Sequence, residues 1–206
     1  MKRTFSIIAL TGLFALCCAT LCTAQHTKDV KKEEKKLVVY FSRTGENYNV
    51  GVIEKGNTHI IADMIANATS ADRFEIVPTK RYPENYDDCV AQAKKELHLD
   101  ARPAVKGDIA IEDYDIIFVG YPNWCGEIPM CVYTFIGKHN WKGKTVIPFV
   151  THEGSGIGST ARNLSEVCAG ANVLVSRGLA VQGKVAQTNK AMAQQSVLQW
   201  LKELGL

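Results

Sequence analysis

Hydroxyl, amide and glycine residues in "YFSRTGENYNVGVIEKGNTH" have the composition of a phosphate-binding loop. Ser42, Thr44 and Gly45 follow an apolar run, and Asn57 and Thr58 open a segment with helical spacing. Hydroxyls, backbone N–H groups and a helix N-terminus together form an anion site that needs no lysine. The sequence therefore predicts a phosphate site formed by these two short stretches.

The same stretch comes close to the nucleoside triphosphate motif G-x-x-x-x-G-K-[ST]. From Gly51 to Thr58 every defined position matches except Asn57, where the motif requires the lysine that binds the phosphates. The motif also needs a strand directly before it, whereas the first strand ends near Ser42. We therefore reject a triphosphate site and interpret residues 46–56 as a flap inserted into another phosphate loop.

Two further segments place polar and aromatic groups after apolar runs, "YPNWCGEIP" and "THEGSGIGST". Trp124 offers a flat aromatic face beside flexible backbone, although a tryptophan that only packs at the core rim remains an alternative. Gly156, Gly158 and Ala161 match the dinucleotide fingerprint, but no acidic residue lies near the expected position about 20 residues on. The fingerprint also occurs in the fourth strand–helix unit instead of the first, so we reject it.

Short apolar runs alternate with amphipathic patterns along the chain. Strands are predicted at 37–41, 73–78, 115–122, 144–152 and 172–183, and helices at 59–69, 86–97, 128–138, 158–168 and 190–206. This alternation predicts an α/β fold, a parallel sheet with helices on both faces. In such sheets ligands bind beyond the carboxyl ends of the strands, which is where all three polar loops are expected.

Three motifs in this order resemble the flavodoxin family, particularly a branch with exported members: "VVYFSRTG…GNT", "IIFVGYPNWCGEIP" and "IPFVTHEGSGIGS". The resemblance extends from Leu37 to the C-terminus. It implies a three-layer flavodoxin-like fold with a five-stranded parallel sheet of order 2-1-3-4-5, and FMN as the cofactor.

The resemblance also assigns the cofactor contacts. The phosphate contacts would be Ser42, Thr44, Asn57 and Thr58, with Gly45 allowing close approach and Arg43 flanking the site. One side of the isoalloxazine ring would be lined by Pro122, Asn123, Trp124, Cys125 and Gly126, and the other by His152, Glu153, Gly154, Ser155 and Gly156. Trp124 would stack on the ring, and carboxylates near it would lower its potential. No catalytic side chain and no metal ligand is predicted.

These features favour a flavodoxin that carries electrons between redox partner proteins or a small donor and acceptor. One alternative is an FMN-dependent NAD(P)H:quinone-type oxidoreductase, with Tyr48, Tyr82, Tyr86 or His152 lining a substrate pocket. Another is a flavodoxin-like scaffold without flavin. A net charge of +3 gives no reason to expect a nucleic-acid partner, and the oligomeric state stays open.

The N-terminal residues indicate export. Lys2 and Arg3 precede an apolar run over about residues 5–16 and then small residues, the pattern of a secretory signal peptide cleaved after Ala24. The run is shorter than the roughly 20 residues of a membrane span. We therefore expect a signal peptide at 1–24, a charged linker at 25–36 and one FMN-binding domain at 37–206, in a periplasmic or extracellular protein.

Cleavage would leave four of the seven cysteines, which are Cys89, Cys125, Cys131 and Cys168. They allow three disulfide pairings, and the sequence does not choose among them. None forms a C-x-x-C pair, and the histidines are too scattered for a metal motif, so no structural metal is expected.

Overall fold

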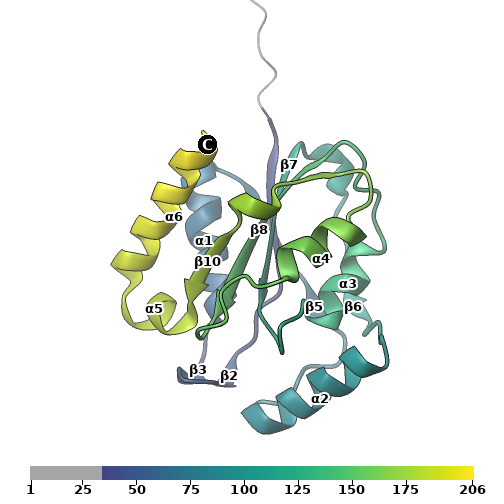
Figure 1. Ribbon diagram of the computed structural model, residues 1–206, viewed down its shortest axis with the longest axis vertical. Coiled ribbons are helices and arrows are strands. Elements are labelled where there is room, and N and C mark those ends of the chain that lie inside the picture. Colours follow the sequence, from purple (N-terminus) through teal and green to yellow (C-terminus); the bar gives the residue numbers. More distant parts are fainter. Residues whose placement is uncertain (1–33) are drawn as a thin grey trace, which may run out of the picture. The chain divides into compact units, whose positions relative to one another are not determined.

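A parallel sheet forms the centre of residues 34–206, the part of the chain that the computed structural model describes (Figure 1). The expected signal peptide at 1–24 and most of the linker at 25–36 lie outside these residues. The strands run in the order β4-β1-β7-β8-β10. Their bounds are β1 Lys36–Tyr40, β4 Asp72–Glu75, β7 Ile116–Pro122, β8 Thr145–His152 and β10 Leu179–Gln182. In chain order this is 2-1-3-4-5, so the predicted fold and strand order are confirmed.

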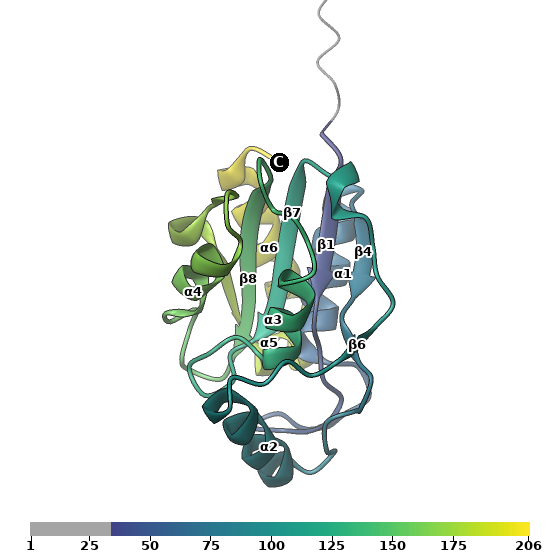
Figure 2. The same cartoon turned by 90° about the vertical axis from the view of Figure 1, so that its right-hand side faces the viewer.

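Helices cover both faces of the sheet, as the two views show (Figure 2). One face carries α1 and α6, the other α3 and α4, and α5 precedes α6. The bounds are α1 Asn57–Thr69, α3 Met130–Ile136, α4 Thr160–Val167, α5 Gly183–Thr188 and α6 Lys190–Leu204. A hydrophobic core lies on each face of the sheet, and alternate strand residues point into one or the other. Val38 and Phe118 pack on the side of α1 and α6, and Val39 and Val119 pack on the side of α3 and α4.

The predicted fifth strand at 172–183 is interrupted. It divides into β9 (Asn172–Val173), the 3₁₀ turn η2 (Val175–Arg177) and β10. Strand β9 pairs with the start of β8, and β10 pairs with its end. The Val146 carbonyl of β8 accepts from the Leu174 N–H, so the backbone of Val146 faces the fifth strand. Backbone groups two residues apart point to the same side of a strand, and Pro148 therefore faces the fifth strand too. Proline has no N–H to donate, and the ladder resumes only at Phe149, paired with Leu179.

The flap inserted at 46–56 contains a β-hairpin, formed by β2 (Gly45–Asn47) and β3 (Gly51–Ile53). The predicted second strand is shorter than expected, because its end leaves the sheet as β5 (Val77–Pro78) and pairs with β6 (Val105–Lys106). The 3₁₀ turn η1 (Ile111–Asp113) and helix α2 (Tyr86–His98) complete the described elements. The hairpin and α2 both lie beyond the carboxyl ends of the strands (Figures 1 and 2).

Cys89, Cys125, Cys131 and Cys168 are free thiols, and Cys125 is the exposed one. Within residues 34–206 no helix combines the length and the apolar character that a membrane span requires. The same residues contain no cluster of metal-ligating side chains.

Candidate functional site

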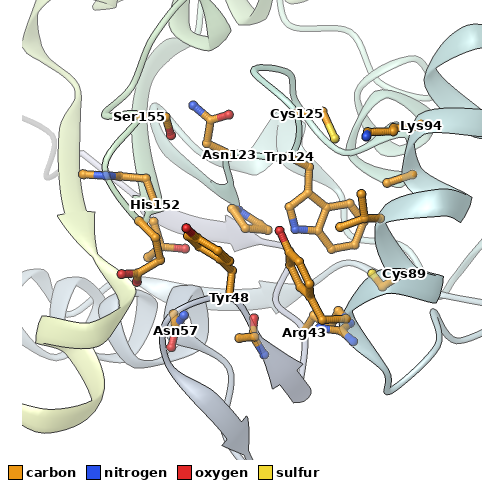
Figure 3. A pocket seen from close by; sticks show the side chains of 17 residues that line it. Arg43, Tyr48, Asn57, Cys89, Lys94, Asn123, Trp124, Cys125, His152 and Ser155 are labelled. Carbon is orange, nitrogen blue, oxygen red and sulfur yellow. The ribbon is translucent and has the colours of Figure 1, made fainter.

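A cavity of about 360 Å³ opens at the carboxyl ends of the central strands, between the three predicted loops (Figure 3). Nine of the residues predicted from the sequence line it: Arg43, Asn57, Pro122, Asn123, Trp124, Cys125, His152, Glu153 and Ser155. They come from segments up to 112 positions apart in the chain, from Arg43 to Ser155. The fold thus brings the predicted loops to one place.

The N-terminus of α1 is open to an anion at one end of the cavity. Gly56 caps the helix without any side-chain hydrogen bond, and the first turn contains no acidic residue. The hydrogen bonds of the described residues give no partner to the N–H groups of Asn57 and Thr58, the first two positions of the helix. Such free N–H groups, with the positive end of the helix dipole, attract phosphate.

Two predicted phosphate hydroxyls lie outside the cavity lining: Ser42 is half-buried and lines a separate hollow, and Thr58 is buried. The Ser42 hydroxyl accepts from the His59 N–H at 3.0 Å, which leaves its own proton free to donate. Thr58 is 1% exposed, and its hydroxyl lies 2.7 Å from the hydroxyl of Thr151. This buried pair joins the start of α1 to the end of β8.

The remaining residues of the first loop lie toward its outer side. The Arg43 guanidinium donates to the carbonyls of Pro83, Glu84 and Asn85 and so ties the loop to the start of α2. Thr44 is exposed and lines a separate hollow, away from the cavity. Gly45 packs against Glu84, whose carbonyl would lie 2.9 Å from an added Cβ.

The loop after β7 forms a tight turn at the cavity mouth. Trp124 and Glu127 exchange backbone hydrogen bonds of 3.0 and 2.9 Å across Cys125 and Gly126. Both central residues have positive φ, 55° and 84°, as in a type I′ turn, and for cysteine this conformation is uncommon. The Trp124 ring packs edge-on against Phe41 at 5.3 Å between centroids. Trp124 therefore lines the cavity and also packs at the core rim, and its stacking on a flavin ring stays a prediction.

Asn123 connects this turn to the loop after β8. Its amide nitrogen donates to the Gly156 carbonyl at 3.1 Å, and its amide oxygen accepts from the Gly126 N–H at 3.0 Å. One side chain thus fixes the distance between the two loops predicted to enclose the ring.

The loop after β8 presents a neutral imidazole to the cavity. His152 Nδ1 accepts from the Gly154 N–H at 2.9 Å, which places the ring proton on Nε2. Burial lowers the pKa of His152, so the ring stays uncharged at neutral pH. The Glu153 carboxylate accepts from the Lys184 N–H at 2.8 Å and so stabilises the start of α5.

One wall of the cavity was not predicted as part of the cofactor site. Apart from Thr151, the added lining residues belong to the flap and α2: Asn47, Tyr48, Tyr86, Cys89, Val90, Ala93 and Lys94. The helical spacing of the α2 residues was visible in the sequence. The sequence does not show, however, that this face turns toward the loops at the end of the sheet.

Comparisons with known proteins agree with this architecture. Among solved structures, a candidate flavoprotein from Bacteroides eggerthii DSM 20697 is 29% identical, with a TM-score of 0.65 over 84% of this chain and 99% of that one. Another from Bacteroides uniformis ATCC 8492 is also 29% identical, with a TM-score of 0.64 over 82% and 98%. A Lactobacillus acidophilus NCFM flavoprotein in complex with FMN has the same fold at 21% identity, with a TM-score of 0.57 over 76% and 97%.

A search of curated proteins gave no match. The family model described as Flavodoxin matches residues 35–204, which include every strand of the sheet and all three loops around the cavity. The chain belongs to the flavodoxin family.

Proposed function

We propose that this protein binds FMN in the cavity and acts as an electron-transfer flavoprotein. The observation that carries the proposal is the meeting of an open helix N-terminus, the Trp124 turn and the His152 loop around one cavity. Family membership supports the cofactor, as does the FMN complex of the Lactobacillus acidophilus protein of the same fold.

The residues present fit the chemistry of FMN. A cavity of about 360 Å³ lies within the usual range for small-molecule sites, about 300–1,000 Å³. The N–H groups at the start of α1 and the Asn57 side chain supply donors for a phosphate. Trp124 and the neutral His152 supply a flat wall and a donor for a ring with polar edges.

FMN supplies the one- and two-electron chemistry when it is bound. The protein's part is to hold the ring, exclude water and place hydrogen-bonding groups at its edge. The turn at Cys125 and Gly126 presents backbone groups there, and Glu127 anchors it. The Glu127 carboxylate accepts from the Tyr133 hydroxyl at 2.9 Å and from the Asn163 amide at 2.7 Å, so it ties the turn to α3 and α4.

Replacing Asn123 by alanine is expected to weaken FMN binding by about 5- to 100-fold. The change removes two hydrogen bonds that join the ring-enclosing loops, each contributing about 0.5–1.5 kcal/mol. FMN titration followed by flavin fluorescence measures the effect. Asn123→Asp is the matched variant: it keeps the acceptor for Gly126 but turns a charged oxygen toward the Gly156 carbonyl, so it is expected to bind FMN no better than Asn123→Ala. Equal affinity in wild type and Asn123→Ala would contradict the bridging role.

The electron-transfer role is tested with the FMN-loaded protein, reduced anaerobically by light and EDTA and then mixed with oxidised cytochrome c. The proposal predicts rapid oxidation of the bound flavin with matching reduction of the cytochrome, and none with the FMN-free protein. A reduced protein that binds FMN tightly but passes electrons to neither the cytochrome nor a small acceptor would refute it.

The proposal includes a redox partner for the protein and a place of action outside the cytoplasm. Both rest on the sequence: on the family resemblance for the partner, and on the signal-peptide pattern ending at Ala24 for export. Fractionation of cells that express the whole chain, with N-terminal sequencing of the product, tests the second point.

A further inference from the structure

Helix α5 lies outside the three loops assigned to FMN, yet one of its side chains reaches the start of α1. Gln187 Nε2 donates to the Asn57 side-chain oxygen Oδ1 at 2.8 Å and to the Lys55 carbonyl at 2.7 Å. Asn57 lines the cavity and lies at one end of it (Figure 3). Gln187 is half-buried and is not part of the cavity lining, so it acts on the site through Asn57.

These two hydrogen bonds fix the orientation of the Asn57 amide. A backbone carbonyl can only accept, so the Lys55 carbonyl requires the nitrogen of the Gln187 amide on its side. That nitrogen carries two protons, and because the second is donated to Asn57, the Asn57 amide must turn its oxygen toward Gln187. The amide nitrogen of Asn57 then lies on the other branch of the side chain, and the hydrogen bonds of residues 34–206 give it no partner.

Gly183, one helical turn before Gln187, leaves room for this nitrogen. A Cβ added at Gly183 would lie 2.1 Å from Asn57 Nδ2, so a side chain there would push the amide out of its place. The same Cβ would lie 2.7 Å from Glu153 Oε1, an oxygen that accepts from the Lys184 N–H instead of from Asn57. Helix α5 therefore holds the Asn57 amide in two ways, by a donor at its oxygen and by space beside its nitrogen.

We propose that Gln187 is a positioning residue for the phosphate of FMN, because it keeps the donor nitrogen of Asn57 available to the phosphate. The proposal rests on the proposed function, since the phosphate is that of the cofactor. Asn57 stands where the triphosphate motif would have a lysine. A lysine ammonium is a donor in every orientation, whereas an asparagine presents a donor or an acceptor according to the direction of its amide. Binding of an anion at Asn57 therefore requires the orientation that Gln187 sets.

The test compares FMN with riboflavin, which lacks the phosphate, in fluorescence titrations of the wild type, Gln187→Met and Gln187→Glu. Methionine is of similar length but has no amide, so the Asn57 amide is released and FMN affinity should fall by about 2- to 10-fold. Glutamate can only accept, so it should turn the Asn57 amide around, and FMN affinity should fall by about 10- to 100-fold. Riboflavin affinity should change by less than about twofold in both variants.

Two controls separate the orientation of the amide from the new negative charge. In the Asn57→Ala background there is no amide to turn, so adding Gln187→Glu should weaken FMN binding by less than about threefold. Gln195→Glu adds the same charge at an exposed position of α6 whose side chain does not line the cavity, and it should leave both affinities unchanged. Circular dichroism checks that each variant is folded at the temperature of the titration.

The outcomes distinguish a failure of this proposal from a failure of the proposed function. If the wild type binds FMN more tightly than riboflavin and both Gln187 variants keep that preference, the positioning role is overturned and the phosphate site stands. Equal losses for FMN and riboflavin also overturn it, because α5 would then only support the shape of the cavity. An undiminished effect of Gln187→Glu in the Asn57→Ala background overturns it too, since charge alone would explain the loss. If the wild type does not bind FMN, the proposed function fails and the positioning role fails with it.

Discussion

Replacement of Gly120 by alanine is expected to lower the free energy of unfolding by about 1–3 kcal/mol or more. Gly120 of β7 stands directly opposite Phe149 of β8, and the phenyl ring covers its Cα. An added Cβ would lie 2.0 Å from Phe149 Cζ, far inside van der Waals contact. Phe149 is fully buried, so its ring has no free space to enter. Urea unfolding monitored by circular dichroism measures the change.

A second substitution distinguishes this clash from other effects. Phe149→Leu removes part of the ring, so the double variant Gly120→Ala/Phe149→Leu should lose less stability than the sum of the single variants. Gly137→Ala is the matched glycine control, because the nearest atom to an added Cβ there lies at 3.4 Å and φ is −66°. Strict additivity in the double variant would show that Phe149 is not the cause.

Replacement of Gly56 by alanine is expected to weaken FMN binding by about 10- to 100-fold. An added Cβ would lie 2.2 Å from the Ser42 hydroxyl and 2.6 Å from the Arg43 carbonyl, so the start of α1 must move away from the first loop. That movement displaces the N–H groups proposed to bind the phosphate. The loss of one hydrogen bond to a charged group costs about 1.5–3 kcal/mol.

FMN titration at a temperature where the variant is folded, checked by circular dichroism, measures this loss. Gly137→Ala again serves as the control, since it lies at the end of α3 and lines no part of the cavity. Riboflavin, which lacks the phosphate, should lose much less affinity than FMN in Gly56→Ala. An equal loss for both ligands would contradict a phosphate contact at the start of α1.

Much of the fold is predictable from sequence because its patterns are local. The buried runs such as 37–41 and 115–122 form strands close to their expected bounds, and the amphipathic run at 86–97 forms α2. The interruption of the fifth strand has a cause elsewhere in the chain, since Pro148 of β8 lacks the donor that the neighbouring strand needs. Reading residues 172–183 alone could not reveal it.

The site is predictable to a similar degree and for the same reason. Loop residues such as Asn123 and His152 line the cavity because strand order alone brings the ends of β7 and β8 together. The position of Tyr48 depends on the hydrogen bonds of Glu46 with Asn85 and Tyr86, which lie 39 and 40 residues further along the chain. Hydrogen bonds between residues so far apart in the chain produce no periodic pattern of residue types, so the sequence does not predict them.

The measurement that tests the account most directly is titration of FMN into the chain from Gln25 onward, followed by quenching of flavin fluorescence. The account predicts one site per chain with a dissociation constant of about 1 μM or below, equivalent to about 8 kcal/mol of binding free energy. It also predicts weaker binding of riboflavin, because the start of α1 would have no phosphate to hold. Absence of quenching at high protein concentration would contradict the flavin site and leave a flavodoxin fold whose cavity holds another ligand.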